Sequence, residues 1–206
     1  IKKMQVLSQY FYKIINYIML RKLGYTIAIL DSGIGGISIL KQLLKLNVNF
    51  IYFADNEYMP YGKRSNEELS VRLDKIINLL REKYQVDKII VACNTASTIL
   101  QGKYEDVVTM RFDSKNTYLA TELTKKNLKN CHIIADSTLA SLIEKYIFDK
   151  SKLNKIIKKH IERHKLYNLR ECVLGCTHYE LVADIFKKYC PNTKIICNSE
   201  FVLNDI

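Results

Sequence analysis

Residues 25–36 read YTIAILDSGIGG, an apolar run that ends in a polar, glycine-rich turn. The run has the length of a buried strand, and a segment with helical periodicity follows it at Ile37–Leu46. A strand that passes through glycines directly into a helix is typical of α/β proteins with parallel sheets. Such a turn can present backbone N–H groups to an anion, although a tight turn with Asp31 as the helix cap explains it equally well.

The same alternation continues along the rest of the chain. Helical periodicity predicts further helices at Asn66–Lys83 and Thr138–Phe148. An irregular stretch around Arg111–Asn116 is the expected domain boundary. We therefore predict an α/β fold with one doubly wound parallel sheet or two smaller ones. Short apolar runs predict five more buried strands, at Phe50–Ala54, Lys88–Ala92, Cys131–Ala135, Cys172–Leu174 and Lys194–Cys197.

The first 24 residues precede this pattern and have a different one. Lys and Arg interrupt the segment too often for a membrane span or a signal peptide. We expect an amphipathic extension, residues 1–24, that packs on the body or on a second subunit, with membrane-surface binding as the alternative. The apolar face of the expected helix consists of Met4, Leu7, Phe11, Ile14, Ile15 and Ile18.

The chain is basic, with a formal net charge of +11 and a pI near 9.3. This charge is compatible with an anionic substrate or a nucleic-acid partner. Nine Lys and Arg but only two acids lie between Lys145 and Arg170, and apolar residues recur there at helical spacing. We predict an amphipathic helix over Lys152–Lys165 with a solvated basic face. Because no nucleic-acid motif accompanies it, we do not expect nucleic-acid binding.

The cysteines and histidines do not form a recognisable metal motif. Cys172 and Cys176 are four residues apart, but no second Cys or His pair completes a zinc site. His160 and His164 share this spacing without a glutamate directly after the first histidine, so we interpret them as surface residues and expect no metal. Six cysteines without a secretory leader favour reduced thiols and a cytoplasmic location.

Two of these cysteines have a more informative setting. Cys93 in ACNTAS (92–97) and Cys176 in LGCTHY (174–179) each follow a predicted strand and precede small polar residues. Parallel sheets form their ligand sites at the carboxyl ends of strands. A buried, inert cysteine would explain either residue alone. Two thiols at such positions suit a reaction in which a proton leaves one face of a carbon and returns on the other.

Four motifs together resemble those of glutamate racemase, a family of the aspartate/glutamate racemase superfamily. They are DSGIGG (31–36), PYG (60–62), ACNTAS (92–97) and LGCTHY (174–179), in the order that the family has. The resemblance implies two α/β domains with the active site between them, and commonly a homodimer. With the boundary expected above, the domains are residues 25–112 and 113–206. The resemblance also implies a cofactor-independent interconversion of L- and D-glutamate that supplies D-glutamate for peptidoglycan.

The resemblance also assigns roles to individual residues. Cys93 and Cys176 are the paired base and acid, and Asp31 and His178 are the polar partners that hold or tune them. Thr138 is a candidate because Thr138 and Ser141 match a threonine-rich ligand loop of the family. The expected substrate-binding residues are Ser32, Pro60, Tyr61, Gly62, Asn94, Thr95, Thr138 and Thr177.

The chain departs from the family in its second half. The interval between Cys93 and Cys176 is shorter than usual, and Glu180 replaces the proline that normally follows the Cys-Thr-His-Tyr motif. A stretch that supplies an acidic residue near the substrate ammonium is also missing. Two alternatives therefore stay open: a racemase for aspartate or another acidic amino acid, and a non-catalytic relative that binds a partner through its basic surface.

Overall fold

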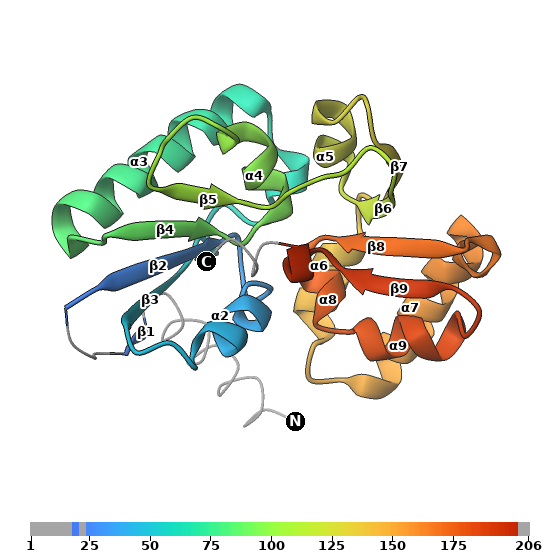
Figure 1. Ribbon diagram of the computed structural model, residues 1–206. Helices are drawn as coiled ribbons and strands as arrows, with labels where there is room; N and C mark the ends of the chain where they lie inside the picture. The colour runs from blue at the N-terminus through green and yellow to red at the C-terminus, as the bar shows by residue number, and fades with distance from the viewer. Residues whose placement is uncertain (1–17, 21–23, 202–206) are drawn as a thin grey trace.

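Strand β2 (Thr26–Asp31) lies inside the first sheet because its side chains are apolar on both faces. The computed structural model describes residues 18–20 and 24–201. Its two lobes, each built on one sheet, lie side by side in Figure 1. The first sheet has the order β1-β3-β2-β4-β5, and only β1 runs antiparallel to its neighbour. The other strands are β1 (Ile18–Leu20), β3 (Asn49–Ala54), β4 (Lys88–Val91) and β5 (Val107–Thr109).

Helices cover both faces of this sheet (Figure 1). Ala28 and Leu30 pack with residues of α3 (Asn66–Tyr84) and α4 (Asn94–Leu100). Ile27 and Ile29 point the other way and pack with α2 (Ile37–Leu43). The alternation of side chains along a strand therefore divides the first lobe into two apolar layers.

The second sheet is entirely parallel and has the order β7-β6-β8-β9. Helices α6 (Leu139–Tyr146), α7 (Lys150–His164) and α9 (Ala183–Tyr189) bury their apolar residues in one cluster against it. The segment of residues 110–116 connects the two sheets. The remaining elements are β6 (Thr117–Ala120), β7 (His132–Ala135), β8 (Glu171–Gly175), β9 (Lys194–Cys197), α5 (Glu122–Asn127), α8 (Thr177–Glu180), and the 3-10 helices η1 (Tyr61–Lys63), η2 (Leu166–Asn168) and η3 (Asn198–Phe201).

The prediction of an α/β fold with parallel sheets is confirmed, and its two-sheet form is the one observed. Every predicted strand is present. Most of the predicted N-terminal extension lies outside the described residues, but Ile18 belongs to strand β1, so its place on a helical face was wrong. Within residues 24–201, no helix is long and apolar enough to span a bilayer.

The basic helix is confirmed as α7, and its buried residues lie on one face. The interpretation of His160 and His164 as surface residues was wrong. The His160 side chain is 8% exposed and that of His164 is 17% exposed, and both contact the carboxylate of Asp136. The two residues continue the face that Leu153 and Ile157 bury, so the helix directs them into the lobe.

Glu180 links α8 to the C-terminal part of the second lobe. Its carboxylate accepts hydrogen bonds from the backbone N–H of Ser199 (3.0 Å) and from the Ser199 hydroxyl (2.6 Å). Burial raises the pKa of Glu180 from 4.5 to about 7. The folded state therefore holds this proton more tightly than the unfolded chain, and the associated stability is present below pH 4.5 and lost as pH rises through about 7.

We expect Glu180→Gln to remove this pH dependence. The loss corresponds to roughly 3 kcal/mol at alkaline pH, since one pKa unit is worth about 1.4 kcal/mol. The difference in Tm between the variant and the parent should therefore change with pH. It should favour the variant by several degrees more above pH 7 than below pH 4.5. Thermal unfolding across this pH range measures it, with the exposed Glu105→Gln as control. The same Tm difference at both pH values would contradict the assignment.

Candidate active site

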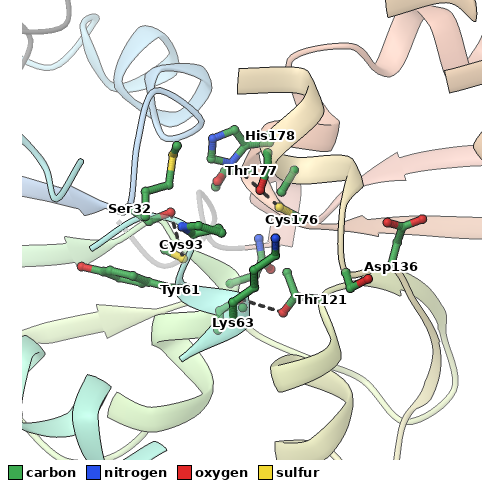
Figure 2. Close-up of a pocket in the computed structure, with 17 residues that line it drawn as sticks. Ser32, Tyr61, Lys63, Cys93, Thr121, Asp136, Cys176, Thr177 and His178 are labelled. Atoms are coloured by element: carbon green, nitrogen blue, oxygen red, sulfur yellow. Dashed lines mark hydrogen bonds between the residues drawn. The ribbon is translucent and has the colours of Figure 1, made fainter. Parts of the chain in front are cut away.

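A pocket between the lobes lies at the carboxyl ends of strands from both sheets (Figure 2). In the first sheet the connection after β2 leads to β3 on one side, and the connection after β4 leads to β5 on the other side. In the second sheet β6 and β8 diverge in the same way, to β7 and β9. Ligand crevices of open α/β sheets form at such switch points. The pocket contains predicted site residues from both lobes: Ser32, Pro60, Tyr61, Gly62, Cys93, Asn94, Thr95, Cys176, Thr177 and His178.

Two glycines allow the lobes to approach this closely. A Cβ atom on Gly35 would lie 2.3 Å from Thr177 Oγ1, and one on Gly62 would lie 2.8 Å from Thr121 Cβ. Each contact joins a loop of the first lobe to the second lobe. A larger residue at either position would push the lobes apart, which explains why the glycine-rich turn and the Pro-Tyr-Gly turn need glycine.

Cys93 lies on the first-lobe side of the pocket, two residues after the end of β4 and at the N-cap of α4. It is buried, and its thiol lies 3.9 Å from the Ser32 hydroxyl. Burial and then the nearby Asp31 carboxylate raise the pKa of this thiol far above its ordinary value. Cys93 is therefore a protonated thiol at neutral pH.

Asp31 connects the two lobes behind Cys93. Its carboxylate accepts hydrogen bonds from the Gly36 N–H (3.0 Å) and from the Thr177 hydroxyl (3.2 Å). Burial raises the pKa of Asp31, while His178 and the backbone N–H groups oppose this effect. Asp31 does not itself line the pocket, so its position suits it to hold Thr177 and to act on Cys93 electrostatically.

Cys176 lies on the opposite side of the pocket, after β8 and at the N-cap of α8. Its sulfur is 4.0 Å from His178 Nδ1, and His178 Nε2 pairs with the carboxylate of Glu144 on α6. Burial lowers the pKa of His178, but contacts with Cys176 and Glu144 outweigh it and raise the pKa well above its ordinary value. A protonated imidazole therefore lies beside Cys176 at neutral pH.

Two residues predicted to bind substrate, Tyr61 and Thr138, do not direct their hydroxyls into the pocket. The Tyr61 ring lines the pocket, but its hydroxyl donates a hydrogen bond to Asp55 (2.8 Å) and points away from the cavity in Figure 2. Thr138 is exposed, does not line the pocket, and donates its hydroxyl to Asp136. Ser137 and Ser141, which flank Thr138 in the sequence, line the cavity instead.

Several hydrogen-bond donors in the pocket are suited to bind carboxylates. Asn94 accepts a hydrogen bond from Asn198 through Oδ1, whereas its buried Nδ2 has no partner among the described residues. The hydroxyls of Thr95 and Thr121 lie 2.9 Å apart. The Lys63 side chain extends into the cavity beside Thr121 (Figure 2).

Sequence reasoning missed Glu144, Thr121 and Lys63. Charged residues of amphipathic helices usually face solvent, so nothing marked Glu144 as buried. Strand β6, which positions Thr121, is short and was not predicted. Lys63 follows the Pro-Tyr-Gly turn, and that proximity was the one available signal.

Comparisons with known proteins identify the family and the fold. No protein-family model matches the chain. Glutamate racemase of Carboxydothermus hydrogenoformans is 30% identical, over 90% of this chain and 80% of its own length. Glutamate racemase 2 of Caldanaerobacter subterraneus is 33% identical, over 78% and 71%. The glutamate racemase structure from Aquifex pyrophilus is 26% identical, with a TM-score of 0.61 over 88% of this chain and 84% of that one.

The structure of the Thermus thermophilus glutamate racemase, at 22% identity, supports the fold. Its TM-score is 0.75 over 90% of this chain and 80% of that one. The curated relatives show the family as well as the fold, because they are at least 30% identical and the matches cover more than two thirds of both chains. The chain belongs to the glutamate racemase family, in the aspartate/glutamate racemase superfamily, and is an isomerase.

Proposed function

We propose that the protein interconverts L- and D-glutamate by a two-base mechanism and supplies D-glutamate for peptidoglycan. The names of its relatives support glutamate as the substrate. The observation that carries the mechanism is the pair of buried thiols that enter one pocket from opposite lobes (Figure 2). A planar carbanion bound between Cys93 and Cys176 can be protonated on either face.

The two sides of the pocket suggest how the reaction begins. Cys176, with the protonated His178 beside it, acts as the base toward L-glutamate and removes the Cα proton. Cys93 is the protonated thiol and delivers its proton to the opposite face. In the reverse direction Cys93 is the base toward D-glutamate and Cys176 the acid. Each turnover transfers one proton to one thiol and one proton from the other, so no redox step is needed.

The substrate carboxylates require donors on both lobes. Asn94 Nδ2 is a buried donor that finds no acceptor within the described part of the chain, and a carboxylate oxygen would satisfy it. Thr95 and Thr121 offer hydroxyls from the two lobes. Lys63 supplies a positive charge at the cavity, so we assign to it the side-chain carboxylate of glutamate.

Lys63→Gln should raise KM for glutamate by about tenfold and leave kcat nearly unchanged. An ion pair with a carboxylate that takes no part in proton transfer stabilises the bound substrate and the transition state equally. Steady-state kinetics measure both constants. Lys45→Gln removes the same charge from an exposed lysine outside the pocket and is the control. A lower kcat with unchanged KM would show that Lys63 acts in the chemical step.

Two structural features accompany the proposal. We propose that residues 25–112 and 113–206 are the two domains, since the first sheet ends at Thr109 and the second begins at Thr117. We also propose a homodimer in the cytoplasm, which light scattering of the purified protein and localisation of a tagged copy in cells would test.

A direct assay tests the proposed activity. Purified protein is incubated with L-glutamate, D-glutamate or L-aspartate in EDTA, with no pyridoxal phosphate or flavin added, and optical rotation is followed. We expect both glutamate enantiomers to racemise and aspartate to react much more slowly. Faster turnover of aspartate would favour the aspartate alternative. Inactivity toward every acidic amino acid tested would favour the partner-binding alternative.

A further inference from the structure

Three potential metal ligands converge in the second lobe, and one of them, Asp136, also lines the pocket that contains the two thiols. Asp136 follows β7, and His160 and His164 lie on α7. His160 Nδ1 is 2.5 Å and His164 Nε2 is 2.8 Å from the same carboxylate oxygen, Asp136 Oδ2. The three ligand atoms lie within 4.8 Å of one another. Within residues 24–201, this is the group of His, Cys, Asp and Glu side chains whose spacing fits a metal ion.

The fold holds these side chains in place. His160 and His164 are one helical turn apart, so they lie on the same side of α7, which packs its apolar face against the lobe. The other carboxylate oxygen, Asp136 Oδ1, accepts hydrogen bonds from the N–H groups of Thr138 and Leu139, each 2.8 Å long. These bonds fix the carboxylate with Oδ2 toward the histidines, as outer-shell partners do in metal sites.

The donor set selects a class of ion. Two imidazole nitrogens and one carboxylate suit Zn²⁺ and its neighbours in the first transition series, whereas Mg²⁺ and Ca²⁺ prefer oxygen ligands. Ligand bonds of about 2.0–2.2 Å place the donor atoms of a tetrahedral ion roughly 3.3 Å apart. Asp136 Oδ2 and the imidazoles need shifts of about 1 Å to reach this spacing, with the ion taking the place of the ring protons that now face Oδ2.

We propose that Asp136, His160 and His164 bind one Zn²⁺ ion, with water as the fourth ligand. The ion ties α7 to the turn between β7 and α6. That turn carries Ser137, and α6 carries Ser141, both of which line the pocket. The ion thus fixes one wall of the pocket and has no part in proton transfer. The proposal is independent of the reaction proposed above.

Metal binding by protein dialysed against chelator tests this proposal. Zn²⁺ alone is titrated by calorimetry, and Co²⁺ is used as a spectroscopic probe of the ligands. We expect one site per chain. His164→Ala removes a direct ligand of the ion. It should therefore weaken Zn²⁺ binding by at least about 100-fold, which is the largest effect typical of losing a partner that only supports a ligand. Asp136→Asn keeps the shape of the side chain and should weaken binding similarly. The control His132→Ala changes an exposed histidine of β7 and should bind as the parent does.

The experiment must separate this site from the reactive thiols, which also bind zinc. We expect a Co²⁺ spectrum without thiolate charge-transfer bands, and the same spectrum in Cys176→Ser. His164→Ala should keep kcat/KM within a few-fold and keep the parent's circular dichroism. Three results would overturn the proposal: no stoichiometric binding by the parent, equal affinity in His164→Ala, or thiolate bands that Cys176→Ser removes. If His164→Ala does not fold, the parent's Co²⁺ spectrum still decides between the two sets of ligands.

Discussion

Cys93→Ser and Cys176→Ser are each expected to lower kcat/KM for racemisation by about 10³-fold or more. A serine hydroxyl is far less acidic than a thiol, so it cannot supply the base on its own face. Both directions must lose equally in kcat/KM, because the two enantiomers have the same free energy in water. Circular dichroism of the glutamate solution follows each direction separately.

Cys131→Ser is the matched control for this pair. Cys131 is a partly buried free thiol next to β7 and does not line the pocket. It should racemise glutamate at the rate of the parent, while all three variants keep the same thermal transition. Near-parental activity in either Cys93→Ser or Cys176→Ser would mean that the thiol concerned has a structural role.

Glu144→Gln is expected to lower kcat/KM by about 10²-fold, although Glu144 does not line the pocket. The Glu144 carboxylate and Cys176 keep the pKa of His178 raised against the effect of burial. A neutral amide lowers that pKa, so His178 loses its proton at a lower pH. The alkaline decline of kcat/KM should therefore shift to lower pH in the variant. Glu144→Asp keeps the charge and should retain more activity.

Isotope effects distinguish this positioning role from a loss of structure. A defect on the Cys176 side slows proton removal from L-glutamate more than removal from D-glutamate. The primary effect of deuterium at Cα should therefore rise with L-glutamate and fall with D-glutamate. A slower variant with unchanged isotope effects and an unchanged pH profile would show that Glu144 only supports the fold. Glu122→Gln, a change of an acid on α5 outside the pocket, is the control.

The sequence predicts β2 and β3 of the first lobe most clearly because these strands are long and rich in apolar residues. β2 and β3 have six residues each, and the turns after them carry glycine or proline. The strands that it misses are short: β1 and β5 have three residues and β6 has four. Their pairing partners stabilise them, so a local apolar pattern was not enough to identify them.

The site was predictable where a residue follows a strand closely. Cys93 and Cys176 meet in one pocket because the carboxyl ends of parallel strands lie at one edge of each sheet. Tertiary packing places the partners that the sequence did not reveal. Glu144 reaches His178 from a helix 34 positions earlier, and Asp136 reaches His160 across 24 positions. A single sequence contains no local signal for such contacts.

The central claim is that one thiol serves each face of Cα, and solvent deuterium tests it most directly. L-Glutamate is incubated with the enzyme in D₂O, and both enantiomers are analysed by NMR and mass spectrometry before a few per cent has reacted. We predict that the D-glutamate formed carries deuterium at Cα while the remaining L-glutamate keeps its proton. Deuterium in the recovered L-glutamate at the same rate, or D-glutamate that retains the original proton, would indicate a single base and contradict the account.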